Sequence, residues 1–119
     1  RYDYIAGLRN FGLNNMLITD KGCCGRVGSV VANVKIEPTK RNGREYCLYK
    51  LSGLCKKCLV ICVNGALKLD FFDRAKCYEV CLYNARVFSD IGLADVCGKC
   101  LANLPCSYTN PAKNLYRGE

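Results

Sequence analysis

The 119-residue sequence contains no histidine and no tryptophan. Without histidine, the chain cannot build a Ser-His-Asp or Cys-His catalytic arrangement, nor a zinc site with mixed cysteine and histidine ligands. General acid-base catalysis at neutral pH would depend on Asp, Glu, Lys, Tyr or Cys. The composition therefore argues against hydrolysis, and we assign no catalytic residue to this chain.

Long hydrophobic runs are also missing. No apolar stretch approaches the roughly 20 residues that a helix needs to span a bilayer, and no basic and then apolar leader opens the chain. We therefore expect a cytoplasmic protein with no membrane partner. Because the first residue is Arg1 and not Met, we also expect a processed product or a piece of a longer protein.

Cysteine, in contrast, is abundant, with 11 residues in a chain that is long enough for one domain with a modest core. Most of the cysteines follow residue 42 in spaced groups: Cys47 alone, Cys55, Cys58 and Cys62 as C-x2-C-x3-C, Cys77 and Cys81 as a helical pair, and Cys97, Cys100 and Cys106 as C-x2-C-x5-C. In two-cluster bacterial ferredoxins, the last cysteine of one run binds the other cluster. Two interleaved runs of this kind would explain both the number and the grouping.

Disulfides and zinc are the alternatives. The cysteine count is odd, and C-x2-C pairs close loops so short that a crosslink gains little chain entropy. Zinc could bind an all-cysteine set of Cys55, Cys58, Cys97 and Cys100. That site would leave four other cysteines without a role: Cys47, Cys62, Cys77 and Cys106.

The remaining sequence predicts few regular elements. Met16 to Thr19 and Val27 to Ile36 are β-prone, and we expect a hairpin or two neighbouring strands there. Residues 38–45 combine Pro, Asn-Gly and basic residues, which predicts a solvated turn and a boundary near Asn42. Good helix formers after Asp73, a candidate N-cap, predict a helix over about 74–88, with Cys77, Cys81 and Phe88 on an inward face.

Several short segments then occur in a recognisable order: "AGLRNFGLNNMLIT", "GRVGSVVANV", "CKKCLVICVNGAL", "RAKC", "DVCGKC" and "CSYTNP". Together they resemble the epoxyqueuosine reductase family, cobalamin- and 4Fe-4S-dependent enzymes related to corrinoid reductive dehalogenases. The resemblance implies an α+β fold. Residues 43–119 would form a ferredoxin-like module that binds two 4Fe-4S clusters, and residues 1–42 would be a short β-rich piece of the neighbouring cobalamin-binding domain.

The resemblance also implies the ligands. The second cluster would be held by Cys62, Cys77, Cys97 and Cys100, and the first by Cys55, Cys58 and Cys106. The position of the fourth ligand of the first cluster in the family is Ser52 here. We predict that Cys47 takes its place, because thiolate is a better ligand than a hydroxyl for iron in a cluster. We interpret Cys23 and Cys24 as loop or packing residues and Cys81 as a buried thiol.

Only five residues precede Ala6, whereas the cobalamin-binding half of the family lies upstream of that motif, so cobalamin would bind only in a longer protein. We therefore expect an electron-transfer module with a redox partner protein, and the family's action on a modified base makes tRNA a further expected partner.

The alternative is a zinc-stabilised nucleic-acid-binding module. The net charge of +8 would favour it, with phosphate contacts from Lys56, Lys57, Arg41 and Arg44. As a surface that guides tRNA in a longer protein, Lys40, Arg41 and Arg44 fit a solvated turn better than an RNA contact.

Overall fold

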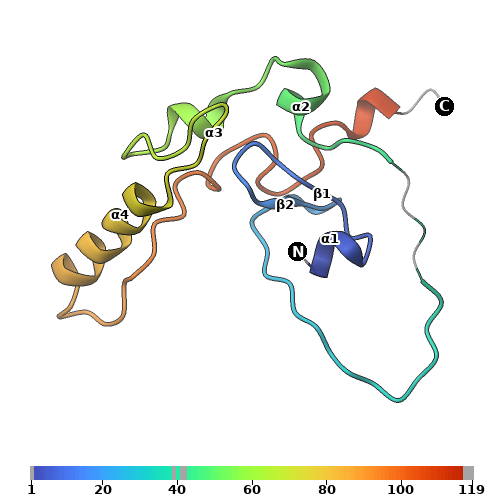
Figure 1. The fold of residues 1–119 in the computed structure, drawn as a ribbon, viewed down its shortest axis with the longest axis horizontal. Helices are drawn as coiled ribbons and strands as arrows, with labels where there is room; N and C mark the ends of the chain where they lie inside the picture. Colours follow the sequence, from blue (N-terminus) through green and yellow to red (C-terminus); the bar gives the residue numbers. More distant parts are fainter. Residues whose placement is uncertain (1, 39, 41–42, 117–119) are drawn as a thin grey trace.

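The chain folds into short elements joined by long loops (Figure 1). A computed structural model describes residues 2–38, 40 and 43–116. The helices are α1 (Tyr2–Ile5), α2 (Leu48–Ser52), α3 (Lys57–Val60) and α4 (Arg74–Val87), the strands are β1 (Asn10–Phe11) and β2 (Leu17–Ile18), and a 3-10 helix, η1, spans Lys113–Tyr116. Within these residues, no helix has the length and apolar character needed to cross a membrane.

The two strands form a small antiparallel hairpin near the N-terminus. Asn10 lies opposite Ile18, and Phe11 lies opposite Leu17. The predicted strand at 16–19 is therefore present as β2, but its partner is β1 and not the segment 27–36. That segment, predicted as a second strand, runs exposed and belongs to neither strand of the described chain. The prediction of a strand there is wrong, because β-branched residues need a neighbouring strand for pairing.

Helix α4 begins where the sequence predicts. The carboxylate of Asp73 accepts a hydrogen bond from the backbone N–H of Lys76 at 3.0 Å, which satisfies one of the unpaired donors of the first turn. Cys77 and Cys81 are half-buried on this helix, as expected. Phe88 is 43% exposed, so its predicted inward position is wrong. No residue of α4 is fully buried, and its half-buried residues are Cys77, Val80, Cys81, Asn84 and Ala85.

A small core joins the hairpin to the start of the cysteine-rich part. Its buried members are Ile18, Cys23, Tyr46 and Cys47. The hydroxyl of Tyr46 donates to the carboxylate of Asp20 at 2.8 Å and accepts from the guanidinium of Arg9. The sequence on both sides of residue 42 therefore contributes to one core. Asn42 itself, where we predicted the boundary, lies outside the described residues.

Packing alone buries little of this protein. Its accessible surface is 9129 Å², whereas a compact monomer of 13.2 kDa should expose roughly 6,400 Å². The radius of gyration is 16.5 Å, against roughly 13.5 Å for a compact domain of this length. In Figure 1, α4 points away from the hairpin and residues 25–38 follow a wide arc. The fold thus depends on something other than a continuous hydrophobic core.

Substitutions at Asp73 test whether its carboxylate caps and stabilises α4. Asp73→Ala should lower the free energy of unfolding by about 1 kcal/mol, because the Lys76 N–H loses its acceptor. Asp73→Asn is the matched control, since it keeps a capping oxygen and should stay near the wild-type value. Denaturant unfolding followed by circular dichroism measures both. An equal loss in the two variants would contradict the capping role.

Candidate metal centre

Four cysteines line one apolar pocket. Cys47, Cys55, Cys58 and Cys106 line a small pocket, with a cavity volume of about 20 Å³, whose other walls are mainly apolar. We call these four cysteines the first thiol group. Cys47 precedes α2, Cys55 and Cys58 lie at the start of α3, and Cys106 comes from the C-terminal loop. The structure therefore brings together the four residues that we predicted for the first cluster.

Cys47 is placed in this pocket by its position at the N-cap of α2. It is only 8% exposed, and its sulfur accepts a hydrogen bond from the backbone N–H of Leu13 at 3.4 Å. Helix α2 then ends at Gly53, whose φ of 75° few other residues adopt easily. This turn directs the following chain back, so that Cys55 reaches the pocket.

Ser52, the competing candidate, does not share this setting. Its hydroxyl donates to the backbone carbonyl of Leu48 at 2.8 Å, one turn earlier in α2, and the residue is exposed. Ser52 does not line the pocket that holds the first thiol group. Of the two residues that we considered for the fourth position, the structure thus places Cys47 beside the other three thiols.

Burial and neighbouring thiols raise the pKa of two members of the first thiol group, Cys58 and Cys106. Burial, together with the negative charges of Cys47 and Cys55 when ionised, raises the pKa of Cys58 to about 11. The hydrogen bond with Cys23, burial and the neighbouring charges of Cys23 and Cys47 raise the pKa of Cys106. Once ionised, these thiolates would repel each other, and a metal ion among them would offset that repulsion.

A second set of four thiols gathers around the start of α4, and we call it the second thiol group: Cys62, Cys77, Cys97 and Cys100. Burial, then the nearby Cys62 and Cys77, raises the pKa of Cys100. Burial, then Cys81, Cys97 and Cys62, raises the pKa of Cys77. Each thiol is thus an electrostatic neighbour of others in the set. These are the four residues that we predicted for the second cluster.

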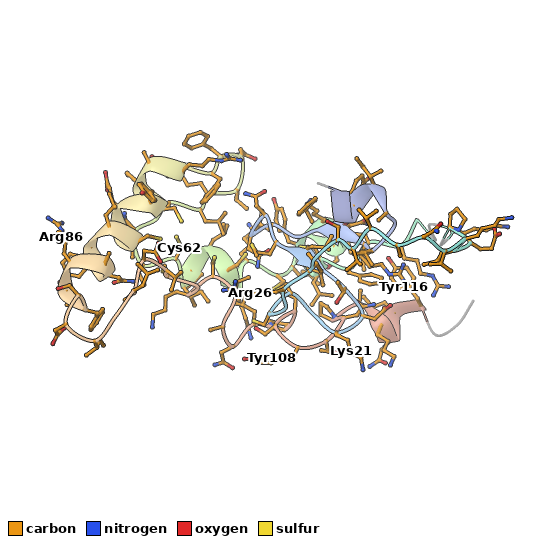
Figure 2. All side chains as sticks on the ribbon, turned by 90° about the horizontal axis from the view of Figure 1, so that it is seen from below. Lys21, Arg26, Cys62, Arg86, Tyr108 and Tyr116 are labelled. Carbon is orange, nitrogen blue, oxygen red and sulfur yellow. The ribbon has the colours of Figure 1, made fainter. Side chains whose placement is uncertain are left out.

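Two asparagine side chains tie the loops of the second thiol group to α4. The amide of Asn64 donates to the carbonyl of Lys76, and the amide of Asn84 donates to the carbonyl of Val96, each at 2.6 Å. These bonds hold the loop after α3 and the loop before Cys97 against the same helix. Figure 2 shows Cys62 beside α4, with Arg86 towards the far end of that helix.

Among the described residues, no three Cys, His, Asp or Glu side chains are close enough together to hold one metal ion. Four sulfurs on a single zinc ion at about 2.3 Å would lie roughly 3.8 Å from each other, whereas in a 4Fe-4S cluster each thiolate binds a different iron.

The zinc alternative draws its four ligands from both thiol groups. Its zinc ligands are divided, because Cys58 has Cys47 and Cys55 as charge neighbours while Cys100 has Cys62, Cys77 and Cys97. Two of its basic residues lie over aromatic rings, Arg44 at 5.1 Å from the centre of Tyr116 and Lys56 at 5.8 Å from that of Tyr49. Lys57 and Lys40 are exposed, and Arg41 lies outside the described residues.

Two further cysteines, Cys81 and Cys23, lie next to these groups. The Cys81 thiol is directed to the carbonyl of Cys77, at 3.6 Å. Cys23 is buried, and its sulfur lies 3.8 Å from that of Cys106. This hydrogen bond is the main cause that lowers the pKa of Cys23 to about 7. We interpreted Cys23 from the sequence as a loop or packing residue. Its contact with Cys106 of the first thiol group was missed, because the two cysteines are 83 positions apart.

Comparisons of the chain with models of known protein families, with curated proteins and with solved structures gave no match. The function of the two thiol groups is therefore inferred from their own geometry and chemistry. The family resemblance and the ligand sets that it implies therefore stay predictions.

The pocket around Cys47 leads to a paired mutational test. Cys47→Ala should abolish the cluster of the first thiol group or convert it to a three-iron form, because one iron loses its thiolate. Ser52→Ala is the control and should leave both clusters intact, since its hydroxyl is bonded to α2. Electron paramagnetic resonance and iron content measure the difference. The reverse ranking of the two variants would show that the first thiol group is wrongly assigned.

Proposed function

We propose that this chain is an electron-transfer module that binds two 4Fe-4S clusters, one in each thiol group. The observation that supports the proposal is the division of eight cysteines into two sets of four neighbours, separate from each other in space and interleaved in sequence. Cys106, from the last cysteine run, belongs with the first thiol group. Cys62, from the earlier run, belongs with the second. Two-cluster ferredoxins exchange their final ligands in the same way.

Helix α3 links the two sites. Cys58 lies within this helix and Cys62 follows its end, so the two ligands are about one helical turn, or roughly 6 Å of axis, apart. A ligand of one cluster and a ligand of the other are therefore joined by a few bonds of backbone. Clusters held at this spacing would pass electrons between them without an intervening cofactor.

The two thiol groups differ in burial and in hydrogen bonds to sulfur, and these differences would give their clusters different reduction potentials. The first pocket has Ile18, Leu104 and Leu13 in its walls, and the Leu13 N–H points at the Cys47 sulfur. Apolar walls restrict water, and N–H bonds to sulfur favour the reduced, more negative cluster. The second thiol group, next to α4, lacks fully buried members. We infer that the two clusters have different reduction potentials, which gives the electron a direction.

Charge is consistent with this role. Each 4Fe-4S core with four thiolates carries about −2 in its oxidised state, so two clusters would reduce the formal charge of +8 to roughly +4. A moderately basic surface remains for a redox partner protein. In a longer, epoxyqueuosine reductase-like protein of the cytoplasm, a cobalamin domain would receive the electrons, and the same surface would guide tRNA. Within this chain we propose no catalytic residue.

Metal analysis tests the proposal directly. Anaerobically purified protein should contain about eight iron and eight sulfide per chain, and its solution should be brown. A content of four each would contradict the two-cluster proposal. Stoichiometric zinc with a colourless solution would favour the nucleic-acid-binding alternative, because zinc has a filled d shell and no visible absorbance.

Removal of the metal tests whether the clusters, and not the small apolar core, hold the fold together. An iron chelator with a reductant should abolish most of the circular dichroism of the folded chain, because few apolar side chains are buried without the clusters. Restoration of iron and sulfide should return the signal. Unchanged circular dichroism after complete loss of iron would show that protein packing alone holds the fold.

A further inference from the structure

We infer that Cys23 and Cys106 are an oxidisable pair of thiols that closes into a disulfide when a peroxide reaches this protein. The two cysteines lie 83 positions apart in sequence, yet their sulfurs are 3.8 Å apart in the fold. Cys23 is 3% exposed, whereas Cys106 is half-buried and lines the pocket of the first thiol group. Cys106 is thus accessible to a small oxidant, and Cys23 lies beside it.

The backbone holds this pair in position for a disulfide. The N–H of Cys23 donates to the carbonyl of Cys106 at 2.8 Å, and the N–H of Cys24 donates to the carbonyl of Ser107 at 2.9 Å. Hydrogen-bonded neighbours of this kind have Cα atoms about 5 Å apart, inside the range of roughly 4.4–6.8 Å found for disulfides. Side-chain rotation alone can then bring the sulfurs to bonding distance.

Gly22 makes this close approach possible. Its φ is 87°, and a Cβ atom at this position would lie 2.4 Å from the carbonyl oxygen of Ser107 and 2.6 Å from the nitrogen of Thr109. Any side chain would therefore push residues 22–24 away from the loop that carries Cys106. The loop itself is held by the buried hydroxyl of Ser107, which accepts from the N–H of Leu104 and donates to the carbonyl of Leu101.

Other pairings are less favourable. Cys24 is exposed, and its thiol donates to the carbonyl of Leu101 at 3.0 Å, although it also interacts with the adjacent Cys23. Cys23 also accepts a long contact from the side-chain amide of Asn14, at 3.9 Å, which orients its sulfur within the core. Cys106 is the cysteine that Cys23 contacts through both its backbone and its sulfur.

The chemistry balances with hydrogen peroxide as the oxidant. One of the two sulfurs, ionised to the thiolate, attacks a peroxide oxygen, the O–O bond breaks, and its sulfenic acid forms while the leaving hydroxide takes up a proton as water. The other sulfur then attacks the sulfenic sulfur, the S–O bond breaks, and the disulfide and a second water form. Both cysteines together lose two electrons, which reduce the peroxide. A dithiol reductant reverses the reaction by thiol-disulfide exchange.

A disulfide at Cys106 would remove one thiol from the first thiol group. The modification would therefore compete with a cluster at that site, and a bound cluster would protect Cys106. This competition rests on the proposed function, whereas formation of the disulfide does not. Oxidation would then block reloading of the site until a reductant reopens the pair.

The test uses the full chain as purified anaerobically, titrated with hydrogen peroxide until its iron is lost and then mapped by mass spectrometry without reduction, beside a sample kept iron-loaded. The Cys23–Cys106 peptide should be the main crosslink and should disappear with dithiothreitol. Cys23→Ser should abolish it, whereas Cys24→Ser, the matched control, should retain it. Gly22→Ala should lower its yield several-fold, because the side chain separates the two backbone segments.

A larger yield of any other disulfide of Cys23 or Cys106, or no disulfide at Cys23, would overturn the inference. An unfolded chain favours short loops such as Cys23 with Cys24, so a main crosslink across 83 positions reports the folded arrangement. Short-range links in place of the Cys23–Cys106 link after the iron is lost would therefore count against the inference.

The iron-loaded arm also separates the two proposals. Protection of Cys106 by iron and sulfide, at least several-fold, supports the competition. Equal crosslinking with and without iron would overturn it. A chain that binds no iron but still forms the link would contradict the proposed function and leave the oxidisable pair standing.

Discussion

Repulsion between crowded thiols is the constraint on which the rest of this structure depends. Burial and neighbouring sulfurs raise the pKa of Cys58, Cys77 and Cys100, so the chain gathers groups that oppose one another once they ionise. The apolar core that surrounds them is too small to compensate. A metal centre in each set, as proposed above, would offset the repulsion and supplement the small apolar core.

The N-terminal hairpin contributes more than its size suggests. It supplies the N–H that reaches the Cys47 sulfur, and Asn14 donates to the carbonyl of Cys100 at 3.0 Å. The network of Arg9, Tyr46 and Asp20 fixes it to the residue that precedes Cys47. Burial would raise the pKa of Asp20, but the bonds from Tyr46 and Arg9 outweigh it and keep that pKa low. The hairpin is thus one wall of the first site.

Local signals in the sequence predicted local structure well. The helix after Asp73 depends on a cap and on helix formers within one segment, and its bounds were close to those observed. Strand β1 and its pairing with β2 escaped prediction, because a strand of two residues shows no alternation of apolar and polar positions. The meeting of Cys23 with Cys106 depends on the fit of Gly22 against Ser107, which no spacing in the sequence reveals. The grouping of the thiols came from a family resemblance, and not from periodicity.

The exposed arc after Cys24 has a consequence for how the molecule behaves in solution. In an extended segment alternate residues share a side, so Val34 and Ile36 face one way while Lys35 and Glu37, whose charges lie 3.6 Å apart, face the other. Val30 and Val31 nearby are almost fully exposed. Such a segment presents both an apolar side and open backbone donors and acceptors, which are the features that recruit another strand. At high concentration, two copies would use these segments to pair edge to edge, so self-association would begin there and leave the thiol groups undisturbed.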